Sequence, residues 1–260
     1  YRLRGLRWPA LAVVVAPLVA GLVVPLVVFV IWVVRGSSTV GVGYSGIGDN
    51  LGFLVEPIVG STVAAVSAAA VAMLVVLPVA VLSVRRPSRR ATAATALVSS
   101  VFALPGIVVA LAIVAWAVSA PEFLSSLYQS FPLLILGYVL HFGAQSMRSS
   151  QAALGAVPAR LGESAAVLGA GPRRRFRTID LPLILPGLLA GGGLVLLSTM
   201  KELPATLLLA PIGFETLATT IWNASEDGFY AEVGVASIVL VALSAVLTWV
   251  LVLRPARGER

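Results

Sequence analysis

ARLGESAAVLGAGPRRRFRTIDLPLILP, residues 159–186, is the stretch that decides the fold. It is the longest passage without the character of a lipid-embedded segment, and strongly apolar sequence flanks it on both sides. Residues 158–169 suit a short amphipathic helix. Pro158 is acceptable near its start, and the glycines of segment 169–171 stop it. A basic cluster at 173–177 comes next, and apolar sequence resumes at Leu181. The sequence therefore predicts a short helix held parallel to a membrane by two spans, with its arginines on the cytoplasmic side.

The composition is that of an integral membrane protein. Of the 260 residues, 59% are hydrophobic and only 11% are charged, whereas about a quarter of the residues in a soluble domain are charged. The chain has no cysteine, which excludes disulfides, zinc–thiolate sites and iron–sulfur clusters. The formal net charge of +7 does not indicate nucleic-acid binding, because the arginines bracket apolar spans and follow the positive-inside rule.

Six apolar segments are predicted to cross a bilayer, which takes roughly 20 residues; the fourth, 131–146, is short and could begin near Leu124. Residues 35–56 between the first two are rich in Gly and Ser, and we interpret them as an external loop rather than a nucleotide cradle. The fold predicted is an all-α integral membrane protein forming a single domain over 1–260. The predicted spans are 9–34, 57–84, 96–118, 131–146, 183–209 and 231–253.

The basic residues predict the topology. With both termini on the cytoplasmic side, only Arg35 and Lys201 of the 18 Lys and Arg residues fall outside. The reversed orientation would place all the others outside, against the positive-inside rule. We therefore predict a multi-pass protein with cytoplasmic N and C termini. Because the chain begins at Tyr1 rather than Met, we expect it to be trimmed or to be one half of a longer fused polypeptide.

The quoted stretch resembles the coupling motif of binding-protein-dependent ABC importer permeases: E-A-A, three residues, G, nine residues, I-x-L-P. Ser164 stands where the family usually has Ala, a small-for-small change. The resemblance implies the type I permease fold with six transmembrane helices in the bacterial inner membrane. It also implies a coupling loop at 148–182, whose helix sits in a groove of a separate ATPase subunit. The matching positions, without a gap, are Glu163, Ser164, Ala165, Gly169, Ile179, Leu181 and Pro182.

The sequence predicts no enzyme active site. It has no GxxxxGK[ST] phosphate loop, so ATP binding and hydrolysis are expected on a partner subunit, with no cofactor in this chain. His141 is the only histidine. A single histidine within a span is more often a hydrogen-bonded packing residue than a metal ligand, so no metal site is predicted.

A second informative stretch is STMKELPATLLLAPIGFETLATTIW, residues 198–222. Lys201 and Glu202 interrupt the fifth predicted span, and charge at membrane depth is costly unless it faces a cavity or a partner. Two interpretations stay open. Either both side chains reach the outer interface, or they line a transport pathway together with Thr199 and Thr206.

The same stretch, with ALPGIVVALA at 103–112 and ASEDGFYAE at 224–232, resembles the iron(III)-type permeases. Those permeases take ferric ion from an extracytoplasmic binding protein and often occur as two fused halves. Relatives carry thiamine, polyamines, molybdate, sulfate or phosphonates, which are the alternative cargoes. The resemblance implies an ATP-driven importer permease for ferric iron. Its expected partners are ABC ATPase subunits, the binding protein, a second permease domain (an identical copy or a fused half) and membrane lipid, with no nucleic acid.

Two other classes of protein compete with this interpretation. A secondary transporter driven by an ion gradient would need coupling carboxylates near the membrane midplane, and Glu202 is the only weak candidate for one. A purely structural membrane protein would leave the spacing of the coupling motif unexplained.

Overall fold

The computed structural model describes residues 7–38, 41–42 and 51–250. This part of the chain is helical apart from one short antiparallel pair of strands, β1 (Ser37–Ser38) and β2 (Gly41–Val42). Residues 39–40 and 43–50 of the predicted external loop, the last residues of the sixth predicted span and most of the arginines near the two chain ends lie outside the described residues. The first helices are α1 (Arg7–Arg35), the 3-10 turn η2 (Leu51–Leu54), α3 (Val55–Arg85), α4 (Arg89–Val101), α5 (Gly106–Ser119) and α6 (Glu122–Ser125).

The second half of the chain is also helical. It contains α7 (Phe131–Ala156), α8 (Ala159–Val167), α9 (Pro172–Arg175), the π-helical segment η3 (Phe176–Asp180), α10 (Leu181–Met200), α11 (Pro204–Leu209), α12 (Leu217–Glu226) and α13 (Tyr230–Thr248).

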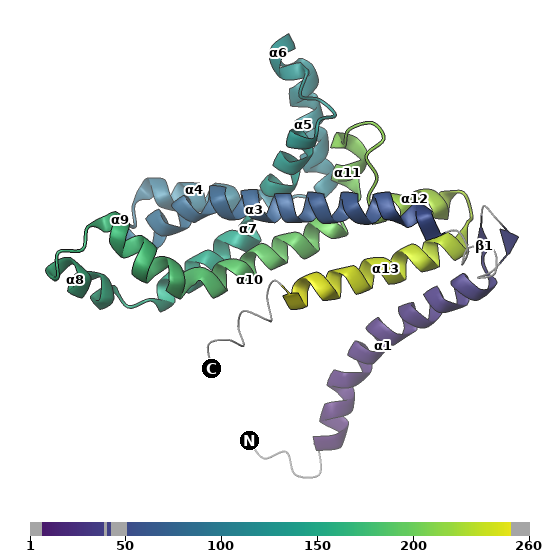
Figure 1. Ribbon diagram of the computed structural model, residues 1–260, viewed down its shortest axis with the longest axis horizontal. Coiled ribbons are helices and arrows are strands. Elements are labelled where there is room, and N and C mark those ends of the chain that lie inside the picture. Colours follow the sequence, from purple (N-terminus) through teal and green to yellow (C-terminus); the bar gives the residue numbers. More distant parts are fainter. Residues whose placement is uncertain (1–6, 39–40, 43–50, 251–260) are drawn as a thin grey trace.

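Three long helices, α3, α7 and α10, pack along one another and form the centre of the bundle (Figure 1). Helix α13 lies beside them, and α1 packs against α13. The short helices α8 and α9 lie at one end of this bundle, and α12 and β1 lie at the other. Helix α5 leaves the bundle at a steep angle, with α11 packed against it. The two ends of the bundle are therefore built from different parts of the chain.

Small residues let the central helices approach closely, as is common in membrane bundles. A Cβ atom at Gly191 of α10 would lie 2.8 Å from the Cβ of Ser149 in α7. One at Gly192 would lie 2.6 Å from the Sδ of Met73 in α3. Helix α3 presents fully buried alanines to the same core: Ala65, Ala68 and Ala72.

The membrane-spanning character is confirmed, in a coarser form than predicted. Four helical segments of the described chain are long and apolar enough to cross a membrane: Trp8–Arg35, Leu51–Arg85, Pro172–Met200 and Tyr230–Thr248. Helices α4 and α5 form a bent pair that would make a fifth. Helix α7 has 26 residues but is not among these segments, and its second half carries Gln145, Arg148 and Gln151. The count of six spans therefore remains a prediction.

Two of the predicted spans are broken in the structure. The predicted span 96–118 ends its first helix at Val101 and restarts at Gly106, with a bend of 107°. The predicted span 183–209 ends at Met200 and restarts at Pro204. Each second helix starts at or just after a proline, which has no N–H to donate to the preceding turn.

The fourth predicted span, 131–146, belongs to a longer helix, because α7 continues to Ala156. Its continuation stays helical because several of its side chains, Met147, Ser150 and Leu154 among them, are buried against neighbouring helices rather than exposed. The predicted coupling loop 148–182 therefore contains the last turns of α7 together with α8, α9 and η3.

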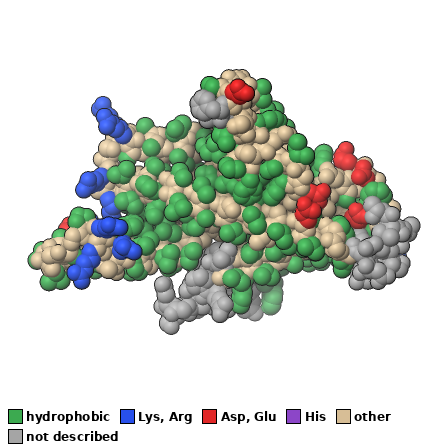
Figure 2. All heavy atoms as spheres, turned by 45° about the horizontal axis from the view of Figure 1, so that its top comes forward, with side chains coloured by type: hydrophobic (Ala, Val, Ile, Leu, Met, Phe, Trp, Pro, Cys, Tyr) green, Lys and Arg blue, Asp and Glu red, His purple; other side chains and the backbone are tan. Residues whose placement is uncertain are grey.

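Charge divides along the long axis of the molecule. Figure 2 shows that Lys and Arg side chains gather at the end that holds α8 and α9, whereas the acidic side chains in view lie mainly toward the opposite end. This distribution agrees with a cytoplasmic position for the α8–α9 end under the positive-inside rule.

Candidate functional site

The structure forms the short helix that the sequence predicts between two long helices. Helix α8 begins after Pro158, whose backbone is extended (φ −62°, ψ 133°). It spans Ala159–Val167 and projects from the end of the bundle (Figure 1). Helix α7 precedes α8, and α10 follows it after α9 and η3. Both α7 and α10 enter the bundle core, so α8 is held at both ends.

Gly169 ends this helix through its backbone conformation. Its φ of +81° lies in the left-handed region, which costs residues with a side chain roughly 1–2 kcal/mol. The turn lets the N–H of Gly169 donate to the carbonyl of Ala166 at 3.0 Å, and the N–H of Ala170 donate to that of Ala165 at 2.9 Å. This pair of bonds is the Schellman arrangement, which explains the glycine at this position of the motif.

The first half of the motif lies on the surface. Glu163 and Ser164 are exposed, whereas Ala165 is only 8% exposed and faces the protein. Beyond them, Val167 and Leu168 are each 87% exposed. We call Leu161, Glu163, Ser164, Val167 and Leu168 the α8 surface. Contiguous apolar surface with a polar rim is a mark of protein-interaction sites.

The second half of the motif anchors the start of α10. Leu181 packs against a buried cluster that includes Met147 of α7 and Ile184 of α10. Pro182 lies in the first turn of α10, directly after the π-helical segment η3. Ile179 is half-buried within η3. The two halves of the motif therefore have different roles, one exposed and one anchoring.

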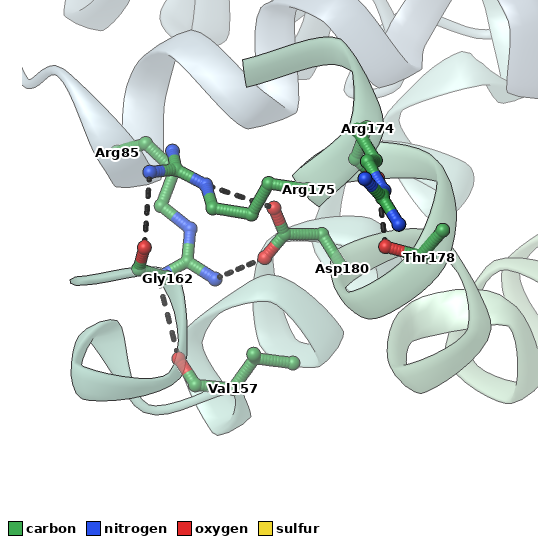
Figure 3. A network of polar contacts seen from close by, with 7 residues as sticks. All are labelled: Arg85, Val157, Gly162, Arg174, Arg175, Thr178 and Asp180. Atoms are coloured by element: carbon green, nitrogen blue, oxygen red, sulfur yellow. Dashed lines mark hydrogen bonds and ion pairs between the residues drawn. The ribbon is translucent and has the colours of Figure 1, made fainter. Parts of the chain in front are cut away.

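Asp180, the variable position of the motif, joins these two halves (Figure 3). Its Oδ1 accepts a hydrogen bond from Nη2 of Arg85 at 3.2 Å, and its Oδ2 lies 3.9 Å from Nε of Arg175. Arg85 also donates to the carbonyl of Val157 at 3.3 Å, and Arg175 to that of Gly162 at 3.4 Å. We call these five residues the Asp180 node.

Sequence reasoning missed this node. Arg85 and Asp180 are 95 positions apart, so no local pattern pairs them. One signal was available, because Asp180 is the only acidic residue between Glu163 and Glu202 and lies three residues after the basic cluster.

The candidate pathway residues lie around the break between α10 and α11. Lys201 caps the end of α10 and is exposed. Oε1 of Glu202 accepts a hydrogen bond from the N–H of Ala205 at 3.3 Å, in the first turn of α11. The structure therefore places the two charges at a helix end rather than within a continuous span.

The two threonines of the set are buried. The hydroxyl of Thr206 donates to the carbonyl of Glu202 at 2.6 Å and lies 2.6 Å from the hydroxyl of Tyr138. Thr199 Oγ1 is buried and has no hydrogen-bond partner within the described residues. Lys201 therefore differs from both threonines, because it alone of these three side chains is exposed.

The two helix breaks meet beside the single histidine. A Cβ atom at Gly106, which opens α5, would lie 2.6 Å from Oε1 of Glu202 and 3.4 Å from Nε2 of His141. The His141 ring packs against Phe142, with ring centroids 4.5 Å apart. Its buried Nδ1 has no hydrogen-bond partner within the described residues, so the hydrogen bond that we expected for this histidine is not seen at that atom.

No cluster of three or more His, Cys, Asp or Glu side chains is placed to hold a metal ion in the described ranges 7–38, 41–42 and 51–250.

Comparison with known sequences identifies a family for most of this region. The profile of the family described as "Binding-protein-dependent transport system inner membrane component" matches residues 77–254. The Fe(3+)-transport system permease protein FbpB 2 of Haemophilus influenzae is 34% identical over 149 residues, which is 57% of this chain and 29% of that protein. PhnV of Salmonella typhimurium, a permease protein assigned to a 2-aminoethylphosphonate transport system, is 30% identical over 115 residues. That match covers 44% of this chain and 43% of PhnV, so the chain spans less than half the length of both relatives.

Solved structures share the fold at low sequence identity. An inward-facing MetNI methionine ABC transporter matches with a TM-score of 0.63 and 19% identity, over 77% of this chain and 93% of the matched chain. A bacterial ABC transporter involved in the import of the acidic polysaccharide alginate matches with a TM-score of 0.68 and 15% identity. The second match covers 97% of this chain and 96% of the other.

Proposed function

This chain belongs to the family of binding-protein-dependent transport system inner membrane components, and from that membership we propose that it is a permease subunit of an ATP-driven importer. The observation that carries the proposal is the α8 surface. Its exposed Glu163, Val167 and Leu168 lie at the basic end of the bundle, on a helix that the coupling motif defines. ATP binding and hydrolysis belong to a separate ATPase subunit that docks on this surface.

The proposed mechanism follows from the position of α8. Closure of the ATPase pair on ATP pushes α8, and the push passes to the long helices that flank it. The permease then alternates between two states, one favoured by ATP on the inner face and one by the loaded binding protein on the outer face. The outer face is the end that holds β1 and α12, and both chain termini lie in the cytoplasm.

We infer six spans of the type I permease arrangement, with α7 as the sixth member. A helix enclosed by protein needs fewer apolar side chains than one surrounded by lipid, because its polar groups meet other helices. Helix α7 packs against α3, α4, α5, α10 and α11, which accounts for its polar second half. A second permease domain, either an identical copy or a fused half, completes the pathway.

The cargo that we propose is ferric iron, delivered by an extracytoplasmic binding protein. The support is the 34% identity to a relative described as an Fe(3+)-transport permease, together with the stretches 103–112, 198–222 and 224–232. A phosphonate is the second candidate, because PhnV matches over a larger share of its own length. Thiamine, polyamines, molybdate and sulfate remain alternatives from the sequence resemblance.

Thr199, Lys201, Glu202 and Thr206 are the proposed pathway residues. The unwound segment between α10 and α11 supports this assignment, because broken helices at membrane depth are tolerated where they line a cavity or are enclosed in protein.

The experiment that tests this function is cargo-dependent ATP hydrolysis by the complete complex in proteoliposomes. The binding protein is supplied empty, or loaded with ferric ion, 2-aminoethylphosphonate or thiamine. Stimulation by the ferric-loaded protein alone is the expected result. Stimulation by another cargo would keep the importer and replace iron. If none of the loaded proteins stimulates hydrolysis or drives uptake, the importer proposal is wrong.

A further inference from the structure

Asp180 lies where three parts of the inner end meet. Arg85 is the last residue of α3, Arg175 is the last residue of α9, and Asp180 directly precedes α10. Each arginine makes two contacts, one to Asp180 and one to a backbone carbonyl next to or within α8. The carboxylate is therefore the centre of two bridges that run from α8 to the long helices (Figure 3).

Partial burial strengthens these bridges. The Asp180 side chain is 14% exposed, that of Arg85 28% and that of Arg175 39%. Charge-assisted contacts are stronger than neutral ones, and they are weakened less by water and salt when they are partly buried. A carboxylate placed between two guanidinium groups also relieves the repulsion between them. Removing the charge of Asp180 would weaken both bridges together.

Little else in the described chain fixes α8 to the bundle. Of its side chains that are described, Ala165 alone is buried, and its main neighbours are α9 and η3. An open pocket of about 250 Å³ is lined by Arg85, Arg175 and Asp180, together with side chains of α3 and α7 and with Phe176. The three charged side chains therefore line one hollow at the junction of α3, α7 and the segment before α10.

We propose that Asp180 is a positioning residue for transport, holding α8 rigidly to α3 and α10 so that a movement of α8 moves both helices. This inference rests on the proposed function, since it assigns a role in ATP-driven import. The role of Asp180 is to transmit displacement through Arg85 and Arg175.

The test is the ratio of cargo imported to ATP hydrolysed, measured in proteoliposomes with the complete importer and its loaded binding protein. Asp180→Asn keeps the shape of the side chain and removes its charge. We expect the ratio to fall roughly tenfold, because the charge that holds both bridges is removed. The amount of ATPase subunit that copurifies should stay at the wild-type level, because the α8 surface is unchanged.

Arg174→Gln is the matched control. Arg174 belongs to the same basic cluster and is exposed, and it contributes its backbone carbonyl rather than its guanidinium to the contacts in Figure 3. The control should keep the wild-type ratio. An equal loss in both variants would show a general effect of charge and overturn the assignment to Asp180.

A double-mutant cycle distinguishes the node from separate contacts. If Arg85→Gln and Asp180→Asn break the same bridge, the double variant should be little worse than either single one, whereas independent effects would add.

If Asp180→Asn does not fold, Arg85→Gln and Arg175→Gln carry the test, and wild-type ratios in both would overturn the proposal. A wild-type complex without ATP-driven uptake would instead refute the proposed function itself.

Discussion

At the scale of single residues, Gly169 shows why the coupling motif contains a glycine. Its positive φ allows the chain to turn sharply after α8, so that Val167 and Leu168 point away from the protein. The sequence predicts this stop correctly, because helix ends depend on local residues. The Asp180 node and the contact of Gly106 with Glu202 were not predictable in this way, because they join residues that are distant in the chain.

We predict that Gly169→Ala destabilises the end of α8 by about 1–2 kcal/mol, since alanine resists the left-handed backbone. The expected result is reduced copurification of the ATPase subunit with the permease. Gly171→Ala is the control, because its φ is −64° and a Cβ atom there would meet nothing within 4 Å. Equal ATPase recovery from the two variants would contradict this account of Gly169.

Lys201 is the residue on which the pathway proposal can be tested most simply. It is exposed at the end of α10, so its removal should leave the fold intact. We expect Lys201→Ala to reduce cargo uptake severalfold while ATPase binding is unchanged. Arg35→Ala removes another exposed cation, at the end of α1, and should have no effect. Normal uptake by Lys201→Ala would favour the alternative in which this side chain only reaches the membrane interface.

At the scale of elements, the sequence predicts where apolar helices occur but not where they bend. Apolar character continues through residues 96–118 and 183–209, so hydropathy alone gives no sign of a break. Pro105 and Pro204 are visible in the sequence, yet transmembrane helices also tolerate proline as a kink. Whether a proline kinks or breaks a helix depends on its neighbours in space. Here the two breaks lie together, because Gly106 has no side chain to collide with Glu202.

Gly106→Ala should therefore disturb the junction of the two breaks. Its Cβ atom would press on the carboxylate that caps α11, and overpacking of this kind costs about 1–3 kcal/mol. The measurement is the thermal unfolding midpoint in detergent, followed by tryptophan fluorescence. Gly155→Ala in α7 is the control, because a Cβ atom there meets nothing within 4 Å.

That control should be neutral or stabilising, since alanine favours a helix over glycine by about 1 kcal/mol. The double variant Gly106→Ala/Glu202→Ala should recover part of the lost stability, because the colliding carboxylate is gone. If Gly106→Ala is as stable as Gly155→Ala, the close contact between the two breaks does not exist in the protein.

At the scale of the whole molecule, charge and apolar length identify the two ends of the bundle. The basic end carries α8 and the acidic side chains in view lie mainly toward the other (Figure 2). The sequence predicts this separation because the positive-inside rule depends on counts of residues. It does not predict that α5 leaves the bundle with α11 beside it (Figure 1), because that arrangement depends on the bend between α4 and α5.

The central claim is that the α8 surface binds the ATPase subunit, and photocrosslinking tests it most directly. The chain has no cysteine, so Val167→Cys provides a single thiol for a photoreactive maleimide. Ile212→Cys is the matched control, because Ile212 is 89% exposed and lies between α11 and α12. In the complete complex, we predict a crosslink to the ATPase subunit from residue 167 and none from residue 212. A crosslink to the ATPase from residue 212 but not from residue 167 would contradict the account.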